Sequence, residues 1–242
     1  MRGVQSEHIL IPASDGNGDV PGFLVVPAGA GPWPGVVMVH EAFGIEENMI
    51  HQAEHLASRG YLVLMPDLYS RGGMRKCLGA TFRALSSGEG QAFRDVEAAQ
   101  KLLSGRKDCT GKMGVIGFCM GGGFALQLAQ RGYDAAAVNY GMMPKDLDAV
   151  LEGACPIVGS YGAKDKTLKR AAARMELALT QRGIAHDIKE YPAANHAFMN
   201  PGPAGPKIMR PLMQKVAGFR PRPDDAADAW SRIDAFFAEH LR

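Results

Sequence analysis

The pentapeptide Gly117-Phe118-Cys119-Met120-Gly121 is the segment of this chain most suggestive of chemistry. It follows the apolar run 112–116 and precedes a stretch with a helical pattern, so Cys119 is expected in a tight turn between a strand and a helix. Such a turn holds its central residue in a strained backbone conformation, and glycine on both sides avoids a steric collision. The pattern predicts a nucleophilic thiol. The alternative is an ordinary tight turn around a buried, inert thiol.

An acid and a histidine follow two later strands. Asp165 comes after the expected strand 156–161, and His196 comes after the expected strand 186–191. The carboxyl ends of parallel strands meet at one edge of a sheet, so we expect Cys119, Asp165 and His196 to converge there. His196 would accept the thiol proton, and Asp165 would fix the tautomer of the ring and stabilise the imidazolium.

Each of these two residues also has a plainer interpretation. Asp165 could cap a helix that starts near Thr167, and His196 could be a hydrogen-bonded histidine in a loop. Three such coincidences at the ends of three strands, in the order nucleophile, acid, histidine, favour the catalytic interpretation.

Strand and helix patterns alternate along the chain. Extended runs at 8–12 and 23–27 flank a cluster of turn-forming residues and predict an antiparallel hairpin. Further strands are expected at 35–40, 61–65, 113–118, 135–140, 156–161 and 186–191, helices at 46–58, 91–103, 122–130, 168–181 and 225–241, and a long connection over 70–90. This alternation predicts an α/β fold with a mostly parallel sheet and helices on both faces. No linker divides the sequence, so we expect residues 1–242 to form a single domain.

Composition narrows the classes of partner. The chain has 242 residues, of which 46% are apolar, and a net charge of only +2 with acids and bases interspersed. Nothing therefore indicates binding to nucleic acid or to a membrane surface, and a small molecule is the expected partner. No apolar stretch approaches the roughly 20 residues of a membrane span, and the first ten residues lack the pattern of an export signal. We expect a cytoplasmic protein, as a monomer or a weak homodimer.

The four cysteines and the histidine pairs do not form a metal-binding pattern. Cys77, Cys109, Cys119 and Cys155 are far apart in sequence, which indicates free thiols rather than a zinc cluster or a disulfide framework. His51 and His55 share a helix face, but the His-Glu-x-x-His signature is absent because Gly44 follows His40-Glu41 where its second histidine would stand. The glycines of 114–123 lack the pattern of a phosphate or dinucleotide site. We therefore expect neither a metal nor a cofactor.

Several separated motifs together resemble the dienelactone hydrolase (carboxymethylenebutenolidase) family, whose members have the α/β-hydrolase fold. They are His-Glu-Ala-Phe-Gly-Ile at 40–45, Gly-Tyr-Leu-Val-Leu-Met-Pro-Asp-Leu-Tyr at 60–69, Gly-Phe-Cys-Met-Gly-Gly at 117–122, Tyr140-Gly141, Gly162-Ala163-Lys164-Asp165 and His196-Ala197-Phe198. The likeness extends from the first hairpin to the last helix.

The resemblance implies roles for individual residues. Cys119 would be the nucleophile, His196 the base and Asp165 its orienting acid, while Glu41 would engage the resting thiol and disfavour its ionisation. The backbone amide of Met120, which the elbow also predicts as a donor, and that of Ala42 would form the oxyanion hole. Tyr140, Phe43 and Phe198 are expected to line the substrate pocket.

One position departs from the family pattern. Members that act on the dienelactone have an arginine four residues after the histidine, to hold the substrate carboxylate, whereas this chain has Asn200. A neutral amide cannot supply that charge. A second family arginine lies in the 70–90 connection, where Arg71, Arg75 and Arg83 are candidates. We therefore expect the substrate to be a more general ester, lactone or thioester.

A different functional class remains open at this point. The chain could be a non-catalytic protein of the same fold that binds a ligand or uses Cys119 as a redox sensor, because a fold alone does not guarantee chemistry. The presence of both an acid and a histidine argues against a sensor, which needs a reactive thiol but no orienting acid.

Overall fold

The computed structural model describes residues 3–13, 16–205 and 220–242. Within these residues, eight strands form one sheet in the order β1-β2-β4-β3-β5-β6-β7-β8. The strands are β1 (Gln5–Ile11), β2 (Val20–Val26), β3 (Trp33–Val39), β4 (Leu62–Pro66), β5 (Cys109–Phe118), β6 (Ala135–Asn139), β7 (Ile157–Gly162) and β8 (His186–Tyr191). The helices are α1 (Glu47–Ser58), α2 (Met74–Ser87), α3 (Gln91–Ser104), α4 (Met120–Leu128), α5 (Leu147–Val150), α6 (Ala171–Arg182) and α8 (Pro223–Leu241).

The sheet has the expected topology. β1 and β2 pair antiparallel, with Gln5 opposite Val26 and Ile11 opposite Val20, and β2 pairs antiparallel with β4. The pairs from β4 through β3, β5, β6 and β7 to β8 are all parallel. The prediction of a mostly parallel sheet with an N-terminal antiparallel hairpin is confirmed.

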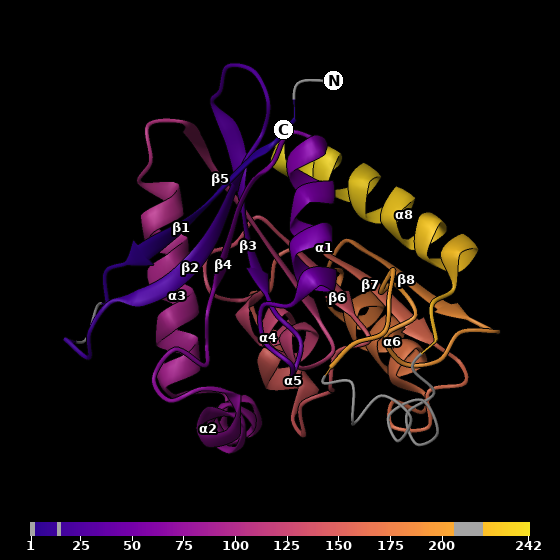
Figure 1. Cartoon of the computed structure of the whole chain (residues 1–242). Helices are drawn as coiled ribbons and strands as arrows, with labels where there is room; N and C mark the ends of the chain where they lie inside the picture. Colours follow the sequence, from indigo (N-terminus) through magenta and orange to yellow (C-terminus); the bar gives the residue numbers. More distant parts are fainter. Residues whose placement is uncertain (1–2, 14–15, 206–219) are drawn as a thin grey trace.

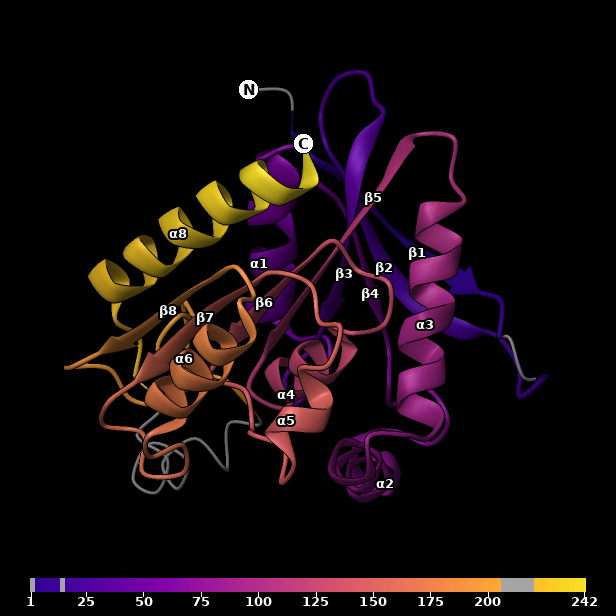
Figure 2. The same cartoon turned by 180° about the vertical axis from the view of Figure 1, so that it is seen from behind.

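Helices cover both faces of this sheet. Figure 1 shows α1 and α8 on the near face, and Figure 2, from behind, shows α3, α4 and α6 on the other. The central strands are therefore apolar along nearly their whole length rather than alternating, and every residue of β6 is buried. Burial on both faces gives the strand ends little freedom to move. The loops that follow them are consequently held by a rigid support.

The long connection expected over 70–90 contains a helix that the sequence analysis did not predict, α2. The helix begins after Gly73, which has φ 75°, and ends at Gly88 in the left-handed conformation with φ 78°. It buries only Thr81, Ala84 and Leu85 of its fourteen residues. Its apolar residues are spaced as regularly as those of α3, but Gly79 in the middle of the helix and glycines at both of its ends are typical of a connection and obscure that pattern. Its buried residues pack against α3 and α4.

Other differences concern boundaries and one short element. α4 begins at Met120, two residues before the expected start, so its first residue directly follows Cys119. α6 begins three residues later than expected, and α8 begins at Pro223, where proline occupies the first turn without losing a hydrogen bond. The single-turn helix α5 was not expected.

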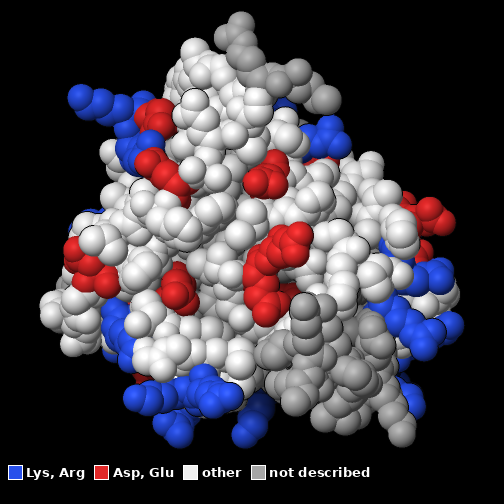
Figure 3. All heavy atoms as spheres, in the orientation of Figure 1, with Lys and Arg blue, Asp and Glu red and all other residues white. Residues whose placement is uncertain are grey.

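The surface carries both signs of charge. On the face seen in Figure 3, acidic side chains lie across the middle, basic side chains lie mostly toward the rim, and uncharged surface separates them. In the part of the chain that the structure describes, no helix combines the length and the apolar character needed to cross a lipid bilayer.

Candidate active site

Cys119 lies at a sharp elbow between β5 and α4. Its backbone has φ 56° and ψ −116°, a conformation that is strained for any residue with a side chain. Hydrogen bonds on both sides hold it there: its N–H donates to the carbonyl of Asn139 at 3.0 Å, and its carbonyl accepts from the N–H of Gly123 at 3.3 Å. The thiol therefore projects from the end of the sheet, half-buried, at the start of a helix.

The glycines on either side of Cys119 are required by close backbone contacts. A Cβ atom on Gly117 would lie 1.9 Å from the carbonyl oxygen of Gly121. A Cβ atom on Gly121 would lie 2.0 Å from the carbonyl oxygen of Val39 at the end of β3. Both neighbours are backbone atoms that cannot rotate away. The sequence pattern at 117–121 is thus explained by the approach of three segments to one point.

Asp165 and His196 lie in the loops after β7 and β8. The ring Nδ1 of His196 donates to Oδ2 of Asp165 at 2.5 Å, and the two residues are only 7% and 2% exposed. The His196 ring is also hydrogen-bonded to the thiol of Cys119. Since Nδ1 is engaged by Asp165, it is Nε2 that faces the sulfur. The structure thus brings the three predicted side chains together in one chain of hydrogen bonds, which we call the Cys–His–Asp group.

The capping interpretation of Asp165 also has a physical basis. Its other oxygen, Oδ1, accepts from the N–H of Thr167 at 2.9 Å and from the hydroxyl of Thr167 at 2.6 Å. These bonds fix the carboxylate in the loop, although α6 itself starts only at Ala171. One oxygen of Asp165 therefore orders the loop and the other orients His196.

Electrostatics favour a charged pair at this site. Burial lowers the pKa of His196, but the charge of Cys119 and the hydrogen bond with Asp165 outweigh it and raise the pKa to about 10. Burial disfavours the charged form of Asp165 too, which by itself would raise its pKa. The interactions with His196 and Thr167 outweigh burial and hold the pKa of Asp165 below its usual range. These two shifts describe a His196 ring that favours its protonated form and an Asp165 carboxylate that accepts its proton in a hydrogen bond.

Glu41 is buried beside this group and has its own partners. The amide nitrogen of Asn200 donates to both of its carboxylate oxygens, at 3.1 and 3.0 Å, and the hydroxyl of Tyr140 lies 3.5 Å from Oε1. Burial raises the pKa of Glu41, more than the Asn200 bond and the nearby His196 lower it. Asn200, noticed in the sequence only as a departure, therefore holds Glu41.

The two residues predicted for the oxyanion hole both adjoin the elbow. Met120 is the first residue of α4, where backbone N–H groups have no partner in a preceding turn. Ala42 follows Glu41 in a turn closed by the N–H of Gly44, which donates to the Glu41 carbonyl at 3.0 Å. The hydroxyl of Tyr69 donates to the Ala42 carbonyl at 2.9 Å.

The predicted pocket aromatics are placed differently from one another. Tyr140 and Phe198 are fully buried, with the Tyr140 ring 5.3 Å from that of His196 and 5.7 Å from that of Phe198. Phe43 is partly exposed and packs beside Gly205. Tyr140 thus packs on His196 within the core and Phe198 packs on Tyr140, and Phe43 alone of the three has substantial exposed surface.

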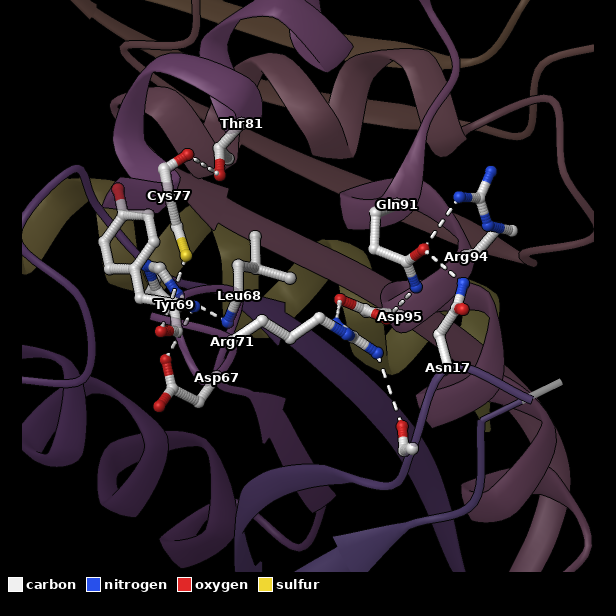
Figure 4. Close-up of polar contacts among 12 residues, drawn as sticks. Asn17, Asp67, Leu68, Tyr69, Arg71, Cys77, Thr81, Gln91, Arg94 and Asp95 are labelled. Carbon is white, nitrogen blue, oxygen red and sulfur yellow. Dashed lines mark hydrogen bonds and ion pairs between the residues drawn. The ribbon is translucent and has the colours of Figure 1, made fainter. Parts of the chain in front are cut away.

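The structure does not bring the predicted arginines to the Cys–His–Asp group. Arg71 forms an ion pair with Asp95 of α3 at 2.5 Å and reaches the carbonyl of Gly18 at 3.4 Å (Figure 4). It lines a hollow between α2 and α3 together with Arg83, and Arg75 is exposed on α2. These positions follow from α2, which the sequence did not predict.

The histidines of α1 have partners of another kind. The ring of His55 stacks on Trp230 of α8 at 4.1 Å, and its Nε2 lies 3.5 Å from Asp234. Among the residues that the structure describes, no group of three or more His, Cys, Asp or Glu side chains could hold a metal ion.

Comparison with known proteins identifies the relationship. The model of the dienelactone hydrolase family matches residues 20–241. This chain belongs to the dienelactone hydrolase family. The resemblance expected from the motifs is confirmed, and the chain is a hydrolase with the α/β-hydrolase fold.

Relatives cover nearly the whole of this dienelactone hydrolase family member. A protein from Methylorubrum extorquens, provisionally assigned as a carboxymethylenebutenolidase, is 29% identical, in an alignment covering 98% of this chain and 82% of that protein. A provisionally assigned dienelactone hydrolase from Klebsiella pneumoniae has a crystal structure with a TM-score of 0.80 and 25% identity, covering 98% and 100% of the two chains. The dienelactone hydrolase-like promiscuous phosphotriesterase P91, from metagenomic libraries, has a TM-score of 0.78 at 20% identity, covers 99% of this chain and all of its own, and shows the shared fold.

Sequence reasoning missed some residues that shape the site of this dienelactone hydrolase family member. His40 and Tyr69 were noticed only as members of motifs, and Thr167 only as a possible helix start. Their hydrogen bonds join segments far apart in the chain, so local patterns carry no signal for them. The polar residue types at strand ends were the only available indication.

Proposed function

We propose that this chain is a cysteine-dependent hydrolase that acts on a small carboxylic ester, a lactone of the dienelactone type or a thioester. Cys119 would be the nucleophile, His196 the general base and acid, and Asp165 the residue that orients the ring. The observation that carries the proposal is the unbroken hydrogen-bond chain from the thiol at the strained elbow through His196 to Asp165.

The reaction would proceed in two halves. The sulfur of Cys119 attacks the substrate carbonyl carbon, and the tetrahedral oxyanion accepts hydrogen bonds from the N–H groups of Met120 and Ala42. The C–O or C–S bond to the leaving group then breaks, and His196 transfers its proton to the departing oxygen or sulfur. In the second half, His196 removes a proton from water, the hydroxide attacks the thioester, and the carboxylic acid and the thiolate separate.

Asp165 would act through His196 rather than on the substrate. Its bond to Nδ1 keeps the lone pair or proton of Nε2 directed at sulfur and stabilises the imidazolium. The low pKa of its carboxyl group supports this role, because the group remains an acceptor over the working range of pH.

Glu41 and Asn200 bear on the class of substrate. Glu41 is a buried carboxyl group near His196, and Asn200 is a neutral amide already bonded to it, so these two described residues offer an acyl group no cation. We infer that the substrate lacks a carboxylate next to the reacting carbonyl. When Glu41 is ionised, its negative charge would disfavour ionisation of the Cys119 thiol in the resting protein.

The test is turnover and adduct formation on a panel of short-chain esters, lactones and thioesters, each with and without a carboxylate. Cys119→Ala is expected to lower kcat/KM by about 10⁴ or more, and mass spectrometry should detect an acyl adduct on Cys119 in the wild-type protein. Unchanged activity in Cys119→Ala would remove the proposal. Adducts confined to the carboxylate-bearing members would overturn the inferred substrate class alone.

The panel also distinguishes the alternative of a thiol redox sensor or ligand-binding protein. Such a protein would show reversible oxidation of Cys119 and no release of alcohol from any ester. Nothing in the geometry specifically favours this alternative.

A further inference from the structure

His40 is a buried histidine outside the Cys–His–Asp group, and its hydrogen bonds determine its tautomer. It directly follows β3 and is 0% exposed. The backbone N–H of Leu68 can only donate, and it lies 3.2 Å from Nε2, so Nε2 carries a lone pair. The carbonyl of Glu41 can only accept, and it lies 2.7 Å from Nδ1, so Nδ1 carries the proton. The ring is therefore neutral and joins two loops.

The carbonyl that His40 binds belongs to the peptide unit that carries the Ala42 N–H. In a planar trans peptide the carbonyl oxygen and the following N–H point in opposite directions. The Glu41 carbonyl accepts from His40 on one side and from the N–H of Gly44 on the other. With both acceptor positions occupied, the carbonyl cannot turn, and the Ala42 N–H stays directed away from the interior of the loop.

Tyr69 fixes the other side of Ala42. Its hydroxyl donates to the Ala42 carbonyl at 2.9 Å and lies 3.6 Å from the sulfur of Met120. Its ring also packs on that of His40, with centroids 5.0 Å apart. Burial raises the pKa of Tyr69, so the hydroxyl keeps its proton and remains a donor. One phenol thus contacts both residues expected to supply the oxyanion donors.

The supports of these two side chains come from the loop that follows β4. The Tyr69 N–H donates to the Asp67 carboxylate at 2.9 Å, and the Asp67 N–H donates to the Pro21 carbonyl at 2.8 Å. Figure 4 shows Asp67, Leu68 and Tyr69 in succession, with the sulfur of Cys77 directed at the backbone of Tyr69. The segment is therefore anchored to the sheet and to α2.

We propose that His40 and Tyr69 are positioning residues for the oxyanion hole, which hold the Glu41–Ala42 and Ala42–Phe43 peptides so that the Ala42 N–H faces the tetrahedral intermediate. The inference rests on the proposed acyl transfer at Cys119. It assigns a function to further residues of the motifs 40–45 and 60–69. The sequence analysis had given roles in the site only to Glu41, Ala42 and Phe43 of these motifs. Both side chains would act through the Glu41–Ala42 and Ala42–Phe43 peptides rather than on the substrate.

The test compares two reactions of the same thiol. Ester acylation passes through an oxyanion, whereas alkylation of Cys119 by iodoacetamide does not. Removing an oxyanion donor lowers kcat by about 10²–10³, so Tyr69→Phe is expected to lower acylation about 10-fold and His40→Leu about 100-fold, with KM within about twofold. The alkylation rate and its pH profile are expected to remain those of the wild type.

Two further variants separate positioning from general stability. His40→Gln retains one donor and one acceptor and is expected to restore most of the acylation rate lost in His40→Leu. Tyr61→Phe removes a hydroxyl that is buried at the opposite end of β4 and has no hydrogen-bond partner among the described residues, and it is expected to leave both reactions unchanged.

The outcomes are distinct from those that test the proposed function. Wild-type acylation in Tyr69→Phe overturns the inference, and so does an equal loss of acylation and alkylation. If His40→Leu fails to fold, the acylation rates of Tyr69→Phe and His40→Gln still test the positioning role. Activity retained in Cys119→Ala removes the proposed function itself, whereas an inactive Cys119→Ala beside a fully active Tyr69→Phe removes only the positioning role.

Discussion

Replacing Asp165 by asparagine perturbs one end of the Cys–His–Asp group while preserving shape. In the wild type, Oδ1 accepts from Thr167 and Oδ2 accepts from Nδ1 of His196. In Asp165→Asn, the amide oxygen can keep the Thr167 bonds, and the amide NH₂ then faces Nδ1. That arrangement requires Nδ1 to accept, so the ring proton moves to Nε2, which faces the sulfur. His196 can then no longer take the thiol proton.

The size of the effect follows from the electrostatics of the pair. A rise in the pKa of His196 from 6.5 to about 10 corresponds to about 5 kcal/mol of preference for the protonated ring. The charge of Cys119 provides the largest part of the increase and Asp165 another part. Asp165→Asn removes both the contribution of Asp165 to the pKa of His196 and the correct tautomer of the ring. We therefore expect kcat/KM to fall by about 10³ to 10⁴. The pKa of His196, followed by NMR, is expected to fall as well.

The matched control is Thr167→Val, which removes the hydroxyl bond of 2.6 Å to Asp165 and leaves the His196 bond intact. We expect kcat/KM within about fivefold of the wild type and a free energy of unfolding lower by about 1 kcal/mol. The assay is hydrolysis of a chromogenic short-chain ester, with urea unfolding of each variant. The reasoning is refuted if Asp165→Asn keeps more than about a tenth of the activity, or if Thr167→Val loses as much as Asp165→Asn.

Two further predictions concern pH and the elbow. Because the pKa of His196 is raised to about 10, the ring stays protonated well above pH 6.5. Ester turnover is therefore expected to decline only as pH rises through about 10. A pH–rate profile in which turnover already declines near pH 6.5 would contradict the raised pKa. Gly121→Ala would place a Cβ atom 2.0 Å from the Val39 carbonyl oxygen and is expected to cost at least about 3 kcal/mol of unfolding free energy. In Gly123→Ala the Cβ atom would lie 3.1 Å from the flexible Leu85 side chain and 3.3 Å from the Met142 carbonyl oxygen, and we expect a cost of about 1 kcal/mol in urea titrations. Equal losses in the two variants would refute the steric argument.

The sheet was predictable because its signal is local. Continuous apolar runs such as Val36–Val39 occur where strands are buried on both faces, and glycines mark the turn at 117–121 because backbone crowding excludes a Cβ atom. The three candidate catalytic side chains were found in the same way, since each follows a strand whose end could be identified. α2 was not predicted, because the glycines within it and at both of its ends are typical of a connection, although its apolar residues have a helical spacing.

The sequence by itself determined the order of the strands along the chain, the elbow, the residue types at the strand ends and the membership of a hydrolase family. The tertiary structure alone decided which partner each polar side chain has: Asn200 on Glu41, Arg71 on Asp95, and His40 and Tyr69 around Ala42. The physical reason is range. Periodicity and steric demand act over a few residues and are written in the local sequence, whereas a hydrogen bond between residues 41 and 200 depends on two loops that only the folded sheet brings within 3 Å.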